Sequence, residues 1–307
     1  MGIAKKDLIC LSDLSVDEIW EVLHKAQEMK EVLLRDDKKY PVLRGKSVIN
    51  LFYENSTRTR SSFEFAGKYL GADVVNINTS SSSVMKGESL KDTALTLDRL
   101  APDVIVMRHG CSGAHEIVAK NVTARVINAG DGAHQHPTQS LLDILTIVEH
   151  KGSLEGLKIA IVGDILHSRV ARSGLWGFKA LGADVTLCAP PTLMPSRADQ
   201  MGVKITYNME EAIKDADVIV MLRIQLERQK AGMFPSIREY AEFYGLDNQK
   251  LKLAKPDCLV MHPGPINRGV EIMPEVADGV QAVIEEQVRN GLAIRMALLS
   301  IMGGAKE

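Results

Sequence analysis

The sequence predicts an α/β fold with two doubly wound domains, each built around a central parallel sheet. Apolar strand-like segments alternate with amphipathic helical segments along the chain, a pattern typical of parallel sheets covered by helices on both faces. The 307 residues exceed an ordinary domain of roughly 100–200 residues. The pattern stops at residues 151–155 and then starts again. We therefore expect a first domain over residues 1–150 and a second over residues 151–279.

In the first half, four apolar segments predict buried strands. They cover residues 46–54, 72–78, 103–109 and 125–130. The helical segments between and after them carry apolar residues at helical spacing and cover residues 56–72, 87–100 and 137–152. The first of these begins with Ser and Thr and the last with Pro, and both end near Gly, as helices often do.

The second half repeats the alternation. Its predicted strands cover residues 158–164, 183–190, 216–222 and 257–263, and its predicted helices cover residues 168–183 and 279–302. In open α/β sheets, ligands bind outside the carboxyl ends of the strands. The polar motifs of this chain each follow a predicted strand, so we expect them to form the binding sites.

The composition excludes several classes of protein. The net charge is −2, from 37 Lys and Arg against 39 Asp and Glu, whereas a nucleic-acid-binding domain is usually strongly basic. No apolar run reaches the roughly 18 residues of a membrane span, and the first residues turn acidic too soon for a secretory signal, so we expect a cytoplasmic protein. The widely spaced cysteines predict reduced thiols rather than disulfides or a zinc site: Cys10, Cys111, Cys188 and Cys258.

The segment Ser56-Thr57-Arg58-Thr59-Arg60 lies between a predicted strand and a predicted helix. Backbone N–H groups at a helix start attract anions, and the hydroxyl and guanidinium groups add further donors. The segment is therefore a candidate phosphate cradle, although it lacks the lysine of a P-loop. An ordinary N-cap followed by solvated arginines explains the same residues.

Two further polar groups follow strands of the first half. Arg108 ends an apolar strand, where its guanidinium offers paired donors to an anion, although a surface salt bridge explains it too. His136 precedes the helix that starts at Pro137, and Gln139 lies in its first turn. A histidine there can donate to a carbonyl oxygen or act as acid or base. His134 and His136 also suggest a metal pair, but catalytic zinc typically has three protein ligands, so we expect no metal.

The second half carries arginines rather than a nucleotide fingerprint. Gly163 follows a strand without the remaining glycines of G-x-G-x-x-G, which argues against a nicotinamide-dependent oxidoreductase. Arg169 and Arg223 each lie just past a predicted strand, and Gln225 follows. Two guanidinium groups suit a dicarboxylate better than a pyrophosphate.

Residues 79–94 form a serine-rich loop that contains Ser82 and Lys86. A lysine in such a loop can close over an anion. From the loop alone, a flexible solvated segment is the simpler interpretation.

Taken in order along nearly the whole chain, these motifs resemble those of the aspartate carbamoyltransferase (aspartate transcarbamoylase) catalytic chains. The resemblance rests on residues 52–60, 85–89, 106–109, 136–139, 223–225 and 262–265. The related ornithine carbamoyltransferases typically have Lys where Glu54 stands, an H-C-L-P motif at residues 262–265 and no counterpart of Lys86. The charges of the second half also favour aspartate over ornithine, because Arg169 and Arg223 would repel the ammonium group of ornithine and pair with the carboxylates of aspartate.

The resemblance implies a carbamoyl-phosphate-binding first domain, an aspartate-binding second domain, and a C-terminal helix within residues 280–307 that packs back on the first. It also implies a homotrimer, in which Ser82 and Lys86 reach the active site of the neighbouring chain. The implied carbamoyl phosphate ligands are Ser56, Thr57, Arg58, Thr59, Arg108, His136, Gln139, Gly264, Pro265 and Ser82, with Thr59, Arg108 and His136 as the catalytic donors. The implied aspartate ligands are Lys86, Arg169, Arg223 and Gln225.

The implied reaction transfers the carbamoyl group of carbamoyl phosphate to the amine of L-aspartate. It gives N-carbamoyl-L-aspartate and phosphate on the route to pyrimidines (UMP), without a cofactor. Two positions depart from the family: Met85 stands where a second lysine is common, and Gly264 stands where leucine is common. The Gly264–Pro265 bond is a candidate cis peptide. A non-catalytic homologue, a carbamoyltransferase for another amino acid, and assembly with dihydroorotase or regulatory chains are open alternatives.

Overall fold

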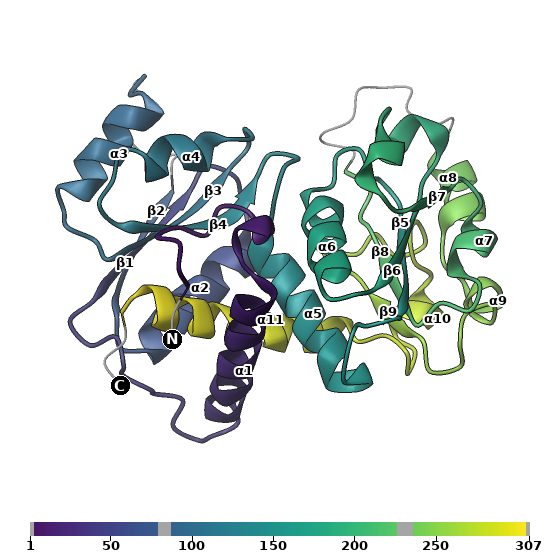
Figure 1. Cartoon of the computed structure of the whole chain (residues 1–307), viewed down its shortest axis with the longest axis horizontal. Helices are drawn as coiled ribbons and strands as arrows, with labels where there is room; N and C mark the ends of the chain where they lie inside the picture. Colours follow the sequence, from purple (N-terminus) through teal and green to yellow (C-terminus); the bar gives the residue numbers. More distant parts are fainter. Residues whose placement is uncertain (1–2, 79–86, 226–235, 305–307) are drawn as a thin grey trace. The chain divides into compact units, whose positions relative to one another are not determined.

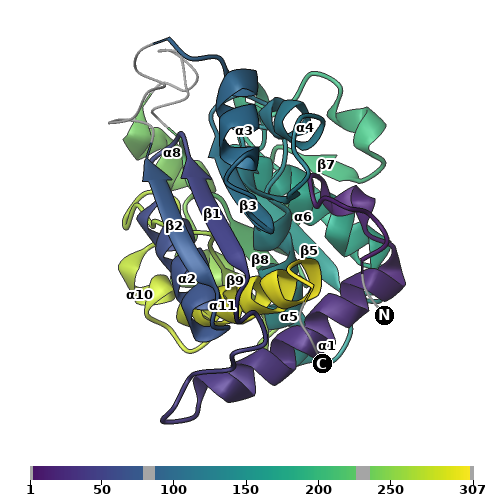
Figure 2. The same ribbon diagram turned by 90° about the vertical axis from the view of Figure 1, so that its left-hand side faces the viewer.

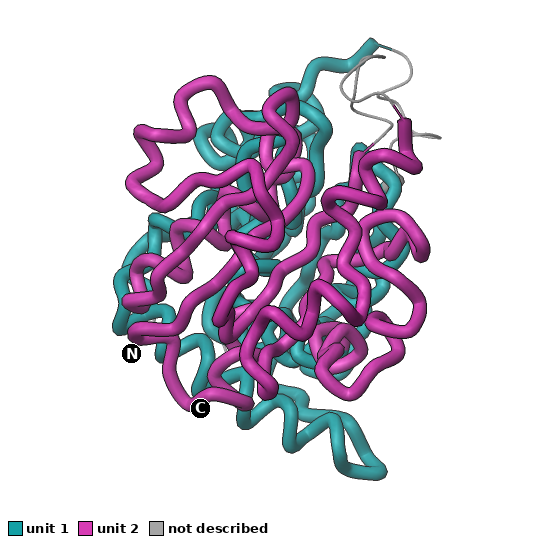
Figure 3. Tube along the Cα trace, turned by 90° about the vertical axis from the view of Figure 1, so that its right-hand side faces the viewer, with its two compact units in different colours: residues 1–142, 289–307 teal, residues 143–288 magenta. Residues whose placement is uncertain are grey.

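In the computed structural model, the chain divides into two compact units (Figure 3). Unit 1 comprises Met1–Leu142 and Arg289–Glu307, and unit 2 comprises Asp143–Val288. The structure describes residues 3–78, 87–225 and 236–304. Two helices contribute residues to both units, α5 (Pro137–Lys151) and α11 (Ile284–Met302). The units therefore divide within α5, whereas the break in the sequence pattern follows that helix.

Unit 1 is built around a four-stranded parallel sheet with the strand order β2-β1-β3-β4 (Figure 1). The strands are β1 (Ser47–Phe52), β2 (Asp73–Asn78), β3 (Val104–His109) and β4 (Arg125–Asp131). Because every pairing is parallel, all four carboxyl ends lie at one edge. Phe52 pairs with Arg108 in the register of β1 and β3. The motif after β1 therefore starts beside the motif that ends β3.

Helices cover both faces of the unit 1 sheet. They are α1 (Val16–Leu33), α2 (Thr57–Tyr69), α3 (Leu90–Asp98), α4 (Ala114–Ala119) and the C-terminal part of α11. Helices α3 and α4 lie beside each other (Figure 2) on a core that includes Ile105 and Met107. Helix α2 packs on β2, where a Cβ at Gly67 would lie 2.6 Å from Val74 and 3.9 Å from Leu299 of α11. This close packing explains why α2 contains a glycine at this position.

Unit 2 contains a five-stranded parallel sheet with the strand order β7-β6-β5-β8-β9 (Figure 1). Its strands are β5 (Lys158–Val162), β6 (Asp184–Cys188), β7 (Lys204–Thr206), β8 (Val218–Met221) and β9 (Leu259–Met261). Its helices are α6 (Arg169–Ala180), α7 (Met209–Ile213), α8 (Ile237–Tyr244), α9 (Asn248–Leu251) and α10 (Pro274–Ala277). Strands β5 and β8 are neighbours at the centre of the sheet, so the segments that follow them start side by side.

The predicted fold class is confirmed, because both sheets are parallel and each expected strand is present. The expected helix over residues 279–302 begins later, at Ile284. The reason is that residues 281–283 extend beside β9: the Val260 N–H donates to the Gln281 carbonyl, and the Val283 N–H donates to the Val260 carbonyl. Within the described residues, no helix is long and apolar enough to cross a membrane.

Candidate functional site

The first turn of α2 carries the candidate anion cradle at the carboxyl edge of the unit 1 sheet. Ser56 is the N-cap, yet its side chain makes no capping hydrogen bond to the described part of the chain. The interpretation of this serine as an ordinary N-cap thus loses its main support. Thr59 is buried, and the first turn holds no acidic side chain that would offset the positive end of the helix dipole. The hydroxyl groups and first-turn N–H groups therefore suit an anion.

Arg108 lies near the end of β3 and is held by two acceptors. Its Nε donates to Glu54 Oε2 and its Nη1 donates to the Ala129 carbonyl, both over 3.2 Å. The Arg108 side chain is only 14% exposed, so the pair differs from a solvated surface salt bridge. A carboxylate that follows β1 and a carbonyl of β4 thereby fix the guanidinium at the edge of the sheet.

Asp131, at the end of β4, organises the loop that leads to His136. Its buried carboxylate accepts the Gln135 N–H over 2.8 Å and lies 2.9 Å from Nδ1 of His134. His136 is buried at the start of α5, and its carbonyl accepts the N–H of the equally buried Gln139 over 3.0 Å. The ring of His134 is thus directed to Asp131. Across residues 3–78, 87–225 and 236–304, no group of three or more His, Cys, Asp or Glu side chains could hold a metal ion.

Arg295 of α11 is a basic residue near the cradle that sequence reasoning missed. It is buried, its Nη1 donates to Ser62 Oγ over 2.7 Å, and its guanidinium lies 5.3 Å from the centre of the Phe63 ring. Burial, and then the positive charge of Arg58, lower the pKa of Arg295 to about 10. An arginine within the apolar run of the last helix is the one signal in the sequence that marks this position.

Asp164, two residues after β5, has the corresponding role in unit 2. Its carboxylate accepts the His167 N–H over 3.1 Å and lies 2.9 Å from His167 Nδ1. The turn leads to Arg169, which begins α6 and is 4% exposed. Gln225 Nε2 lies 3.5 Å from the His167 carbonyl, so the segment with Arg223 and Gln225 meets the segment that leads to Arg169. The two predicted aspartate-binding arginines therefore follow adjacent strands.

The remaining predicted residues fall into two groups. Gly264 and Pro265 follow β9 and are joined by a cis peptide bond. Gly264 has a φ of +60°, a left-handed conformation that glycine adopts without the strain of a Cβ. Ser82 and Lys86, together with Met85, lie outside the described residues.

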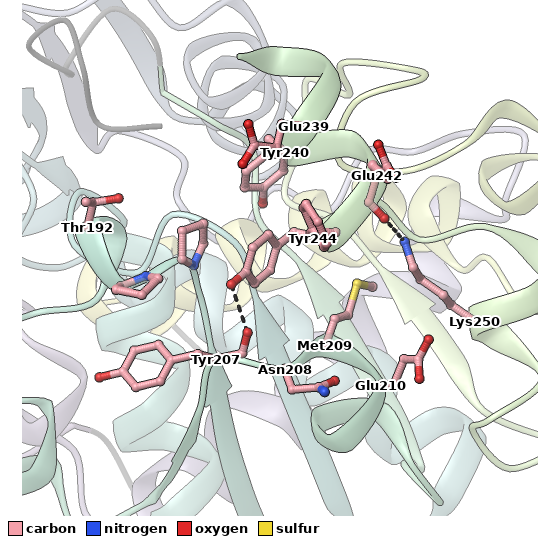
Figure 4. Close-up of a pocket in the computed structure, with 13 residues that line it drawn as sticks. Thr192, Tyr207, Asn208, Met209, Glu210, Glu239, Tyr240, Glu242, Tyr244 and Lys250 are labelled. Atoms are coloured by element: carbon pink, nitrogen blue, oxygen red, sulfur yellow. Dashed lines mark hydrogen bonds between the residues drawn. The ribbon is translucent and has the colours of Figure 1, made fainter. Parts of the chain in front are cut away.

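Unit 2 also contains a cavity of about 970 Å³, shown in Figure 4. Within it, Tyr244 Oη donates to the Tyr207 carbonyl over 2.8 Å. Of the described residues that line the cavity, none belongs to the predicted substrate ligands. Its walls carry Glu210, Glu239 and Glu242, which do not suit an anionic substrate. This cavity is therefore not where the predicted substrate ligands lie.

Family models match both halves of the chain. The model of the aspartate/ornithine carbamoyltransferase carbamoyl-P binding domain matches residues 6–149. The model of the Asp/Orn binding domain of the same family matches residues 155–302. The two matches together cover both units.

Individual proteins show the same similarity. The chain is 57% identical over 306 residues to the aspartate carbamoyltransferase catalytic subunit of Moorella thermoacetica, covering 99% of this chain and 100% of the relative. Its structure resembles an ornithine carbamoyltransferase from Pyrococcus furiosus, with a TM-score of 0.87, 33% identity and 100% coverage of both chains. It equally resembles an aspartate transcarbamoylase from Trypanosoma cruzi in complex with carbamoyl phosphate and aspartate, with a TM-score of 0.86, 33% identity, and coverage of 97% of this chain and 96% of the other. The shape alone thus does not distinguish the two amino-acid acceptors.

Proposed function

Because the chain belongs to the aspartate/ornithine carbamoyltransferase family, we infer that it is the catalytic subunit of an aspartate carbamoyltransferase. It transfers the carbamoyl group of carbamoyl phosphate to the amine of L-aspartate and releases phosphate. The product, N-carbamoyl-L-aspartate, enters pyrimidine biosynthesis. The 57% identity to a full-length aspartate carbamoyltransferase catalytic subunit supports aspartate rather than ornithine as the acceptor.

The pair of arginines in unit 2 is the observation that carries the choice of acceptor. Arg169 and Arg223 follow the neighbouring strands β5 and β8. Each guanidinium presents a fork of donors that matches a carboxylate, so two of them complement the two carboxylates of aspartate. Ornithine has an ammonium group in place of the side-chain carboxylate, and the same positive charges disfavour it.

Carbamoyl phosphate is assigned mainly to unit 1. Its phosphate group binds the first turn of α2 and Arg108, and its carbonyl oxygen accepts from Thr59, Arg108 and His136. The phosphate ligands are Ser56, Thr57, Arg58, Thr59 and Arg108, with Ser82 and Lys86 of a neighbouring chain. Its amino group donates to Gln139 and to the carbonyls of Gly264 and Pro265. Three observations in unit 1 support this. The Ser56 side chain makes no capping bond within the described residues, the first turn of α2 has no acidic side chain, and Glu54 holds the guanidinium of Arg108.

The chemical step needs donors aimed at the carbonyl oxygen. When the aspartate amine attacks the carbonyl carbon, a C–N bond forms and that oxygen gains negative charge. Thr59, Arg108 and His136 donate to it, and one such donor typically contributes a factor of about 10²–10³ to kcat. The bond between the carbon and the phosphate oxygen then breaks, and the departing phosphate takes the proton of the amine. Glu54 holds Arg108 in place beforehand, so little reorganisation is needed.

The aspartate carboxylates bind Arg169 and Arg223, with support from Gln225 and from Lys86 of a neighbouring chain. Because Ser82 and Lys86 act in the site of the adjacent subunit, this assignment makes the enzyme an oligomer. We propose a homotrimer and a cytoplasmic location. The word "subunit" in the names of the relatives also supports partner chains, such as regulatory chains or dihydroorotase. The assignment needs no cofactor, since phosphate is already a good leaving group.

A carbamoylation assay with three acceptors tests the proposed function. The purified chain is incubated with labelled carbamoyl phosphate and with L-aspartate, L-ornithine or N-acetyl-L-ornithine. We expect labelled N-carbamoyl-L-aspartate and an equal amount of phosphate with aspartate, and no labelled product with the other two. Preferential product formation with ornithine or acetylornithine would contradict the proposal.

A further inference from the structure

His262 directly follows β9 and is buried, and both of its ring nitrogens are engaged. Its Nδ1 lies 2.7 Å from the backbone nitrogen of Gly264. Because a backbone N–H can only donate, this ring nitrogen accepts and carries no proton. The proton therefore resides on Nε2, which lies 3.1 Å from Oε1 of Glu271 and donates to it. The two contacts fix the tautomer and the orientation of the ring.

Glu271 binds the backbone on the other side of the same turn. Its Oε1 also accepts the N–H of Asn267 over 2.7 Å, whereas its Oε2 has no hydrogen-bond partner within the described residues. The Glu271 carbonyl accepts the Leu246 N–H over 3.0 Å, which ties this residue to the segment after α8. The His262 ring thus anchors the backbone at Gly264, and the Glu271 carboxylate anchors it at Asn267. Residues 263–266 are therefore held by both side chains.

The ring and carboxylate are themselves fixed to the framework of unit 2. The backbone N–H of His262 donates to Gln287 Oε1 over 3.0 Å, and Gln287 Nε2 donates to Asp143 Oδ1 over 2.7 Å. His262, Glu271, Gln287 and Asp143 are all at least 97% buried. In contrast, Gly264 is half-buried and Pro265 is exposed. A rigid, buried polar network thus carries a short turn that reaches the surface.

Stability alone is a poor reason for this arrangement. A buried ionisable pair contributes little net stability, because desolvation offsets most of the attraction. A satisfied buried network does specify one backbone geometry. The geometry specified here is that of the Gly264–Pro265 segment.

We propose that His262 and Glu271 are positioning residues for carbamoyl phosphate: they hold the Gly264–Pro265 turn so that its carbonyls accept from the carbamoyl amino group. The inference rests on the proposed function, which gives these two carbonyls that role. Neither side chain touches the substrate. A misplacement of about 1 Å in such a contact can cost roughly 10²-fold in rate.

Two variants of Glu271 separate positioning from general destabilisation. Glu271→Leu removes the acceptor, so we expect a 10- to 100-fold fall in kcat/KM for carbamoyl phosphate. Glu271→Gln keeps an oxygen where Oε1 accepts from both donors, so we expect activity within a few-fold of the wild type. His262→Asn, which can keep an acceptor for the Gly264 N–H, should retain more activity than His262→Leu.

The inhibition constant of inorganic phosphate distinguishes a positioning role from a general loss of structure. Phosphate is assigned to unit 1, so its inhibition constant should stay within twofold in Glu271→Leu. Asp217→Ala is the matched control: this buried carboxylate binds the Lys158 N–H and Lys255 Nζ at the start of β5 and β8. It should lower Tm and leave both kinetic constants unchanged.

Different results would overturn the proposed function and the positioning role of His262 and Glu271. If the wild type makes no N-carbamoyl-L-aspartate, the proposed function falls and the positioning role falls with it. If the wild type is active but folded Glu271→Leu and His262→Leu keep their kcat/KM for carbamoyl phosphate, only the positioning role is overturned. An equal loss of phosphate and carbamoyl phosphate binding would likewise overturn it.

Discussion

At the scale of single residues, the site depends on carboxylates that hold other polar side chains in place. Glu54 accepts from Arg108, Asp131 pairs with His134, and Asp164 pairs with His167. The sequence predicts the cationic residues, because substrates with negative charge require them. It does not predict the acidic partner of Arg108, which lies 54 positions away in the chain and approaches only when β1 and β3 pair.

Replacement of Arg108 tests its role as a donor to the carbonyl oxygen. Arg108→Ala should lower kcat by about 10²–10³, the typical effect of one lost oxyanion donor, and leave Tm comparatively little changed. Steady-state kinetics and thermal unfolding measure the two effects. Lys46→Ala is the control, because Lys46 also pairs with a carboxylate, Asp103 over 2.8 Å, but at the opposite end of the sheet. An unchanged kcat in Arg108→Ala would contradict the assigned role.

The cysteines give a prediction about reactivity. Burial raises the pKa of Cys188 and Cys258 to about 12 and that of Cys10 to about 11. The thiolate is the reactive form, and a group with a raised pKa stays protonated at pH 8. Iodoacetamide should therefore label the exposed Cys111 first, as followed by mass spectrometry of the peptides. Rapid labelling of Cys188 or Cys258 in the folded protein would disagree with this burial.

At the scale of elements, one helix start differs from the others that have serine at the N-cap. Ser15, Ser89, Ser168 and Ser236 each accept an N–H from the first turn of their own helix. Ser56 of α2 makes no such bond within the described residues. The local sequence does not reveal this difference, because S-T-R-T has the composition of a normal cap. The conformation of the backbone decides which hydroxyl group caps the helix.

A pair of serine variants tests this difference. Ser15→Ala removes a capping box with Glu18 and should cost about 1 kcal/mol, a fall in Tm of about 2–4 °C, with no change in kcat/KM. Ser56→Ala should leave Tm nearly constant and raise the KM for carbamoyl phosphate. Thermal unfolding and kinetics on the same preparations check both. A large loss of Tm in Ser56→Ala with normal kinetics would restore the simple N-cap interpretation.

Two of the elements that the sequence analysis does not predict were missed for different reasons. Strand β7 (Lys204–Thr206) is only three residues long, too short for a periodic signal. Helix α1 has a recognisable start at Ser15 with Glu18 three positions later, a capping-box pattern that would have found it. Several of the strands that the sequence predicts have a run of buried apolar residues, such as β3 and β5. The edge strand β2 is predicted as well, although its Val75 is 53% exposed.

At the scale of the whole molecule, each unit carries cationic residues that we assign to one of the two substrates. Unit 1 holds the α2 cradle and Arg108, and unit 2 holds Arg169 and Arg223. The net charge of −2 conceals this concentration. The sequence predicts the division into two α/β halves, because the strand–helix alternation restarts. It does not predict that α5 and α11 contribute to both units. The sequence of a helix does not show at which residue the helix passes from one hydrophobic core to another.

The shared site of the proposed trimer leads to a test by complementation. Arg58→Ala and Lys86→Ala should each be nearly inactive, because each lacks a cation for the phosphate group. Mixed trimers should regain part of the activity, because some sites then combine an intact Arg58 with an intact Lys86 from the neighbour. Activity is measured on hybrids purified by differential tags. Verified hybrids without any recovery would refute sites that are shared between chains.

The most direct test of the division between the units is the effect of Arg223→Ala on each substrate separately. We expect the KM for aspartate to rise about 100-fold or more, because a charge-assisted pair of hydrogen bonds to a carboxylate is lost. The Kd of carbamoyl phosphate, measured by calorimetry without aspartate, should stay within twofold. An equal weakening of both substrates would contradict the claim that unit 2 selects the amino acid while the cradle of unit 1 binds the phosphate.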